Sequence, residues 1–175
     1  MKQWNVRTTA LVVVMIAVTA TLTWLVQVPV PATGGYIHLG DMAANFAALA
    51  FGPGIGFLIA GGGMAIADLL GGYIAFAPVT LIVHGLQGAV VGYLGKKHRP
   101  WIMLLAGAIG GMIVVAGYFL YEWLILAQGS QAGLNAALVE VPGNILQVSI
   151  GLIGVPLYML VARAYPPLAR WTAKS

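Results

Sequence analysis

Long apolar stretches, separated by short polar or glycine- and proline-rich breaks, follow one another along the whole chain. A helix that crosses a bilayer needs about 20 apolar residues, and most of these stretches reach or approach that length. The sequence therefore predicts an all-α integral membrane bundle, with residues 1–175 forming a single six-helix transmembrane domain. The six expected transmembrane helices are residues 8–28, 39–51, 55–70, 78–94, 101–126 and 142–164.

The second and third segments are short, and Gly52, Pro53 and Gly54 separate them tightly. Short, glycine-interrupted membrane segments often border a solvated cavity, because exposed backbone is tolerated only there. Residues 28–40, which contain two prolines and paired glycines, are expected to form a loop.

Composition supports the membrane assignment. Hydrophobic residues make up 61% of the chain and charged residues 7%, with a mean hydropathy of +0.95, so a soluble fold could not bury this apolar surface. The first segment is too long for a typical signal peptide, and we expect it to be retained as a helix. No cysteine is present, which excludes disulfides and thiolate metal sites.

The charged residues indicate an orientation. The basic residues fall at alternate gaps between the apolar segments, and cationic residues are retained on the cytoplasmic side. Six crossings then place both termini in the cytoplasm. Because the basic residues flank membrane segments, we expect a lipid bilayer around the chain and no nucleic acid as partner. The basic set is Lys2, Arg7, Lys96, Lys97, Arg99, Arg163, Arg170 and Lys174.

The four acidic residues, Asp41, Asp68, Glu122 and Glu140, have no obvious ionic partner. A carboxylate in or near hydrocarbon is costly unless something satisfies it, so these positions are the first candidates for function. No catalytic constellation accompanies them, and residues 88–97 lack the glycine and hydroxyl positions of a phosphate-binding loop. We therefore expect no enzyme, no ATPase and no cofactor. His38, Asp41 and His84 are scattered donors, and no metal site is expected from them.

Glu140, Asn144 and Gln147 follow the spacing i, i+4 and i+7, which places them on one stripe of an apolar helix. Such a stripe faces either a neighbouring helix or a cavity, not lipid. We favour a cavity, because the acids and several aromatic residues fall toward the same outer end, and such a mixture is typical of a small-molecule pocket. The residues expected to bind substrate are Tyr36, His38, Asp41, Asn45, Asp68, Tyr73, His84, Gln87, Glu122, Glu140, Asn144 and Gln147.

Two alternatives stay open within this set. His84 and Gln87 share a helix face and could equally line the pocket or join helices. Asp68 precedes Leu69-Leu70-Gly71-Gly72 and could fix that loop by capping backbone amides.

Several motifs, taken in their order along the chain, resemble those of a known family. They are Pro29 to Asp41, Phe51-Gly-Pro-Gly, Ala65 to Tyr73, Ala77 to Leu81 and Glu140 to Gln147. The chain resembles the substrate-binding (S) subunit of an energy-coupling factor (ECF) vitamin transporter, in the branch of hydroxymethylpyrimidine, pyridoxine and riboflavin-type subunits.

The resemblance implies a vitamin or vitamin precursor, held in an outward-facing pocket that the loops after the first and third helices close. It also implies association with one transmembrane scaffold and two cytoplasmic ATPases in a prokaryotic cytoplasmic membrane, and release of cargo by toppling. Val13, Ala17 and Thr21 would form the ridge that docks on the scaffold. Nickel and cobalt subunits of this family use an amino-terminal histidine, whereas this chain begins Met1-Lys2-Gln3, so an organic cargo is expected.

Pyridoxine or hydroxymethylpyrimidine is the favoured cargo, because acids and amides suit a small hydroxymethylated ring and no basic residue is placed to bind a phosphate or carboxylate. Riboflavin, thiamine or another vitamin stays open. An autonomous facilitator is the alternative from another class, but it needs a continuous polar path that the cytoplasmic halves of the segments do not offer. A membrane enzyme has the least support, since no nucleophile, base and orienting group lie together.

Overall fold

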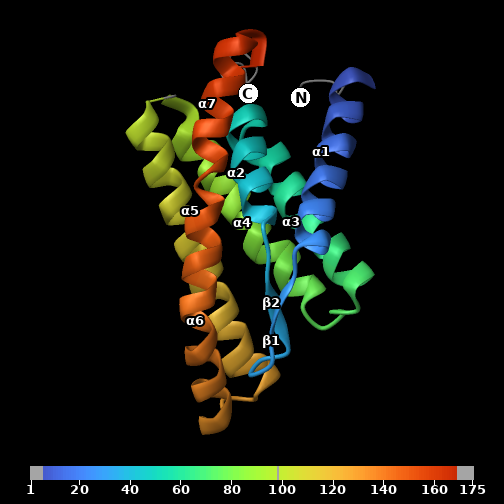
Figure 1. Ribbon diagram of the computed structural model, residues 1–175, viewed down its shortest axis with the longest axis vertical. Helices are drawn as coiled ribbons and strands as arrows, with labels where there is room; N and C mark the ends of the chain where they lie inside the picture. The colour runs from blue at the N-terminus through green and yellow to red at the C-terminus, as the bar shows by residue number, and fades with distance from the viewer. Residues whose placement is uncertain (1–5, 98, 169–175) are drawn as a thin grey trace.

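The structure is a computed structural model that describes residues 6–97 and 99–168 (Figure 1). The helices are α1 Val6–Leu25, α2 Gly40–Phe51, α3 Pro53–Gly71, α4 Ala77–Leu94, α5 Pro100–Leu120, α6 Gln131–Gly151 and α7 Gly154–Ala164. A 3-10 turn, η1 (Gly95–Lys97), follows α4, and a π-helical turn, η2 (Tyr121–Leu126), continues α5. The strands β1 (Val28–Val30) and β2 (Gly35–Ile37) form an antiparallel hairpin in which Pro29 lies opposite Tyr36.

The prediction of an all-α membrane bundle with six helical segments is confirmed, and α6 and α7 together make the sixth. Five segments of the described chain are long and apolar enough to cross a membrane. They are Thr8–Leu25, Pro53–Gly71, Ala77–Leu94, Pro100–Leu126 and Gln131–Ala164. The remaining helix, α2, has 12 residues, and at 1.5 Å per residue it spans only about 18 Å.

Two boundary expectations differ from the structure. The sixth segment begins at Gln131, so the expected start at 142 is wrong; Ser130 caps it, with its hydroxyl oxygen accepting from the backbone N–H of Gly133 at 3.1 Å. Pro142 lies inside α6, where neighbouring helices make a proline tolerable. Residues 28–40, expected as a loop, contain the hairpin. Of the basic residues, Lys2, Arg170 and Lys174 lie outside the described residues.

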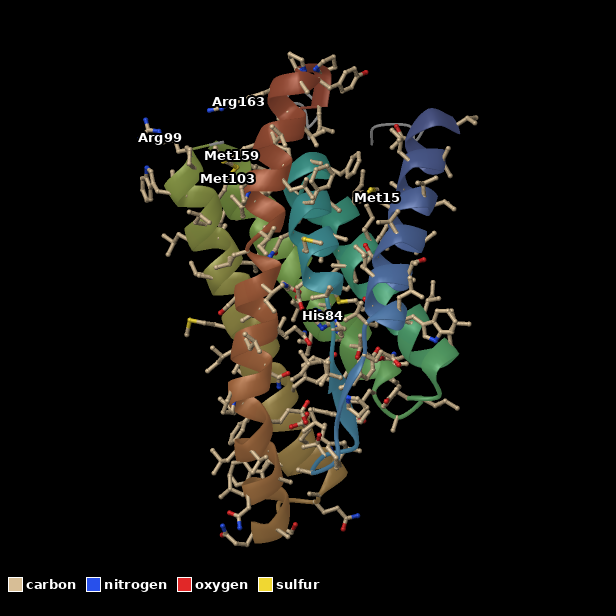
Figure 2. The ribbon with its side chains drawn as sticks, in the orientation of Figure 1. Met15, His84, Arg99, Met103, Met159 and Arg163 are labelled. Carbon is tan, nitrogen blue, oxygen red and sulfur yellow. The ribbon has the colours of Figure 1, made fainter. Side chains whose placement is uncertain are left out.

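The two ends of the bundle differ in character. The start of α1 and the end of α7 lie at one end, and Arg99 and Arg163 lie there too (Figures 1 and 2). The tip of the hairpin and the α5–α6 connection lie at the other end (Figure 1). The main apolar core, which includes Met103, lies in the half toward the arginines, whereas His84 lies farther from them (Figure 2). Polar side chains are thus concentrated away from the basic end.

The short helix α2 lies at the centre of the bundle and packs against α1, α3, α4, α6 and α7. It begins at Gly40 in the middle of the molecule, and the hairpin continues its column toward the other end (Figure 1). By contrast, α1 lies at the periphery, packed mainly on α2 and α3. Only 22% of its spanning window is buried, against 50% for α4, so α1 leaves the largest surface for lipid or a partner.

Helices α3 and α4 approach each other most closely at glycines. A Cβ atom on Gly61 would collide with the backbone oxygen of Leu81 and lie 3.0 Å from the Cα atom of Gly85. Because backbone atoms form this obstacle, a side chain there cannot be accommodated by a rotamer change. The next residue, Gly62, would carry a Cβ atom into open space.

This difference predicts opposite effects for neighbouring substitutions. Gly61→Ala should lower the free energy of unfolding by about 1–3 kcal/mol, because it overpacks the α3–α4 interface. Gly62→Ala should leave it unchanged or raise it by up to about 1 kcal/mol, since alanine is the better helix former. Thermal unfolding of the two purified variants in one detergent measures the contrast. Equal melting temperatures would contradict the close approach of α3 and α4.

Candidate functional site

Asp41 is the centre of a buried polar cluster. It lies in the first turn of α2 and is 0% exposed, and a helix amino terminus favours a carboxylate. Its Oδ1 accepts a hydrogen bond from Gln87 Nε2 of α4 at 2.6 Å, and its Oδ2 accepts one from Gln147 Nε2 of α6 at 2.7 Å. One carboxylate therefore joins three helices.

His84 of α4 adds a histidine to this cluster (Figure 2). Its Nδ1 lies 2.7 Å from Gln87 Oε1 and 3.4 Å from Asp41 Oδ1. Its other ring nitrogen, Nε2, is buried and has no hydrogen-bond partner among the described residues. Nδ1 of His84 thus takes part in the hydrogen-bond network, whereas Nε2 makes no hydrogen bond to a described residue.

His38, in the segment between β2 and α2, closes the cluster from the hairpin side. Its backbone N–H donates to Gln147 Oε1 at 2.9 Å, and its Nδ1 accepts from the backbone N–H of Gly40 at 3.1 Å. Burial lowers the pKa of His38 to about 4, and the nearby Asp41 carboxylate offsets only part of this effect. The ring is therefore neutral near pH 7, which agrees with its role as an acceptor.

One ligand atom each of His38, Asp41 and His84 lies within 4.8 Å of the others, so these three side chains could converge on a cation. Both oxygens of Asp41 already accept amide hydrogens, however, and Nδ1 of each histidine is engaged. This arrangement favours a hydrogen-bonded network, and the absence of a metal stays a prediction.

A small cavity of about 10 Å³ lies next to the cluster. That is room for about one water molecule. Six of the residues expected to bind substrate line it, namely Tyr36, His38, Asp68, Glu140, Asn144 and Gln147. Gly35, Phe76, Thr80 and Tyr118 complete the lining. The cavity therefore lies between the hairpin, α3, α4, α5 and α6.

The hairpin is attached to α3 through an aromatic contact. The hydroxyl of Tyr36 donates to Asp68 Oδ1 at 2.5 Å, and the rings of Tyr36 and Tyr73 have centroids 4.4 Å apart. Burial and the Asp68 carboxylate raise the pKa of Tyr36 above its usual value, so the phenol remains a donor. Asp68 Oδ2 is buried without a partner among the described residues. The side chain of Asp68 thus accepts its hydrogen bond from Tyr36 of the hairpin, and not from the backbone amides of the loop after α3.

Asn144 is the cavity residue with the most free hydrogen-bonding capacity. It is 3% exposed, and its side chain makes no hydrogen bond to any described residue. Glu140, one turn earlier, accepts a hydrogen bond from the Thr33 hydroxyl of the hairpin. Of the stripe on α6, Gln147 is bound into the Asp41 network, whereas Asn144 faces the cavity without a partner.

The remaining expected residues lie elsewhere. Asn45 donates through Nδ2 to the backbone oxygen of Gly151 at 2.9 Å, so it joins α2 to α6 and does not line the cavity. Glu122 in η2 is buried and interacts with Glu140 behind the lining. The docking residues Val13, Ala17 and Thr21 are all exposed on α1.

Sequence reasoning did not include Thr33 or Thr80 among the site residues. Thr80 and Tyr118 are buried and pair through their hydroxyl oxygens at 2.7 Å. A signal for Thr80 was present, because Thr80, His84 and Gln87 repeat the i, i+4, i+7 spacing of the stripe on α6. Thr33 carried no such signal, since its contact with Glu140 depends on how the hairpin folds back.

Comparison with known proteins identifies a family model and two relatives that match this chain. Residues 3–163 match the family model described as "ECF-type riboflavin transporter, S component". An uncharacterized protein from the gap 3′ region of Pyrococcus woesei is 35% identical over 155 residues, covering 87% of this chain and 99% of that protein. The thiamine precursor transporter HmpT of Lactococcus lactis subsp. cremoris is 27% identical over 150 residues, covering 85% of this chain and 83% of its own length.

The contrast between Asp41 and Asn144 predicts different effects on stability. Asp41→Ala leaves two buried amide donors unpaired and should lower the free energy of unfolding by about 2–5 kcal/mol. Asn144→Ala removes no hydrogen bond of the empty protein and should change it by less than about 1 kcal/mol. Thermal unfolding without ligand compares the two. A loss of stability in Asn144→Ala as large as that in Asp41→Ala would mean that Asn144 is structural.

Proposed function

The chain belongs to the family of ECF-type riboflavin transporter S components, and on this basis we propose that its cargo is a small single-ring vitamin precursor, hydroxymethylpyrimidine or pyridoxine. It is a membrane-embedded substrate-binding subunit for a vitamin or vitamin precursor and not itself an ATPase. The observation that carries the choice of cargo is the lining of the cavity, which offers carboxyl, amide and hydroxyl groups and no lysine or arginine.

The chemistry of the lining supports a neutral or cationic ligand rich in hydrogen-bond donors. Asp68 Oδ2 is an acceptor without a partner, and Asn144 has both its amide oxygen and its amide nitrogen free. A phosphate or carboxylate would be buried here without a countercharge, which is costly. Hydroxymethyl, amino and ring-nitrogen groups, by contrast, match the available atoms. Phe76 and Tyr118 add ring faces for stacking.

The size of the cavity supports a single ring. Even a pyrimidine exceeds the present volume, so the hairpin must move for cargo to enter. Three hydrogen bonds hold the hairpin and the residue that follows it in place: Thr33 to Glu140, Tyr36 to Asp68, and His38 to Gln147. All three connect it to residues that line the cavity, so the hairpin is suited to act as the cover. A fused three-ring flavin with its ribityl chain would require a much larger displacement.

The relative from Lactococcus lactis, named a thiamine precursor transporter, supports hydroxymethylpyrimidine over pyridoxine. Riboflavin is the alternative that the name of the family favours, and thiamine or another vitamin would also suit an acidic pocket.

Transport would require partners, and the exposed face of α1 is the proposed docking surface. Val13, Ala17 and Thr21 lie on this face. Most of α1 is not covered by the rest of the bundle, since only 22% of its spanning window is buried. We assign the partners as a transmembrane scaffold and two cytoplasmic ATPases, with cargo released when the subunit topples. The end that carries Arg99 and Arg163 would then face the cytoplasm of a prokaryotic cell.

An autonomous facilitator is less well supported. The main apolar core, with Leu49, Val91 and Met103 fully or almost fully buried, lies between the cavity and the basic end. A polar ring would need a path lined with polar groups to pass through that half. The described residues of this core are apolar and offer no such path. Movement of the whole subunit avoids this barrier.

The proposed cargo predicts a clear selectivity. Purified protein in detergent should bind hydroxymethylpyrimidine, and its phosphate ester should bind at least about 100-fold more weakly, because a buried phosphate finds no cation. Asn144→Ala should weaken binding by about tenfold, through loss of its hydrogen bonds. Isothermal titration calorimetry measures each affinity. Tight binding of riboflavin without binding of the pyrimidine would reject this cargo and leave the assignment to the family intact.

The docking surface predicts a second result. Ala17→Trp should reduce co-purification with a co-expressed scaffold and its two ATPases, because a bulky side chain prevents close approach of helices. Ala108→Trp on α5, where alanine is also exposed, is the matched control and should leave co-purification unchanged. Equal recovery in both variants would place the interface elsewhere. Ligand flux in proteoliposomes that contain this chain alone would support the facilitator.

A further inference from the structure

Two carboxyl groups of the chain lie together beside the cavity. Glu122 belongs to η2 and Glu140 to α6, two elements that pack against each other, and the two carboxyl groups interact electrostatically. Each is only 3% exposed. No lysine or arginine lines the cavity beside them, so no cationic side chain of the lining is placed to neutralise this pair.

Glu122 is the less satisfied member of the pair. Both of its carboxylate oxygens are buried without a hydrogen-bond donor among the described residues. Its backbone oxygen accepts from the N–H of Ala127 at 3.1 Å, five residues on, which is the bond that defines the π-helical turn. Such turns are rare and frequently occur at functional sites. An acceptor of this kind, left without a donor in a membrane protein, is costly unless a ligand supplies one.

A second, independent feature points into the same place. Asn144 lies one helical turn after Glu140 on α6 and lines the cavity with it. It is 3% exposed and has no hydrogen-bond partner among the described residues. Glu140 itself is bound only from the hairpin, by the hydroxyl of Thr33. The end of the cavity toward Glu140 therefore combines acidic acceptors with an unpartnered amide.

We propose that Glu122 and Glu140 form a subsite that receives an amino group or a protonated ring nitrogen of the cargo. This inference rests on the proposed pocket and deepens it, because it states which chemical group lies at which end. An amino group donates two hydrogens and a protonated nitrogen adds a positive charge, so either offsets the repulsion of neighbouring carboxylates. Asn144 would bind an adjacent ring nitrogen or hydroxyl group.

The experiment compares two ligands that differ in one group: hydroxymethylpyrimidine, which carries a 4-amino group, and 5-hydroxymethyl-2-methylpyrimidine, which lacks it. Affinities are measured by calorimetry for the natural chain, Glu122→Gln and Asp68→Asn. Asp68→Asn is the matched control, since it also removes one buried carboxylate beside the cavity. Glu140→Gln serves as a second variant of the pair should Glu122→Gln fail to fold.

The natural chain should prefer the aminated ligand by about tenfold or more. Glu122→Gln should reduce this preference toward one, mainly by weakening the aminated ligand, whereas Asp68→Asn should weaken both ligands alike and so retain the preference. A preference that persists in Glu122→Gln and Glu140→Gln, or that is lost only in Asp68→Asn, would overturn the subsite. Loss of binding to the natural chain on addition of EDTA would assign the pair to a metal ion and would also overturn it.

The proposed cargo and the subsite fail in different ways. If the natural chain binds neither pyrimidine, the cargo is wrong and the subsite for it is overturned as well. If it binds both with the same affinity, the pocket and its single-ring cargo stand, and only the assignment of the amino group is lost.

Discussion

The hydrogen bonds of one buried carboxylate hold the interior of this bundle together. Asp41 begins α2 in the middle of the molecule and accepts amide hydrogens from Gln87 and Gln147, on two different helices. In a membrane, where helices gain little from the hydrophobic effect, such bonds help to fix which faces meet. Gln147 also accepts from the backbone of His38. The position of the hairpin is therefore coupled to the packing of α2, α4 and α6.

The shortness of α2 is what creates room for a site. A helix of full length would run through the whole bundle, but α2 begins only at Gly40, in the middle of the molecule, and the hairpin occupies the space before it (Figure 1). Strands β1 and β2 satisfy each other's backbone groups, and the side chains of Tyr36 in β2 and Thr33 in the turn reach to α3 and α6. The cavity thus has helices on most sides and, on the remaining side, one small element that a few hydrogen bonds attach to them.

The distribution of polarity fits a subunit that binds cargo and leaves energy supply to other chains. The acid and amide side chains that line the cavity lie in the half of the bundle away from Arg99 and Arg163, whereas the half toward these arginines is packed with apolar side chains. A continuous polar path through the molecule is not offered by the described residues. The exposed face of α1 is the surface that we propose for docking of another membrane protein.

The sequence by itself determined the membrane class, five of the six helical segments within a few residues, and the family, because apolar length and ordered motifs are properties of the chain alone. It also placed Glu140, Asn144 and Gln147 on one stripe, since helical periodicity is local. Only the tertiary structure decided that Asn45 joins helices and that Thr33 reaches Glu140. Those roles depend on which faces meet across more than a hundred residues of chain, and no local pattern encodes the fold of the hairpin against α6.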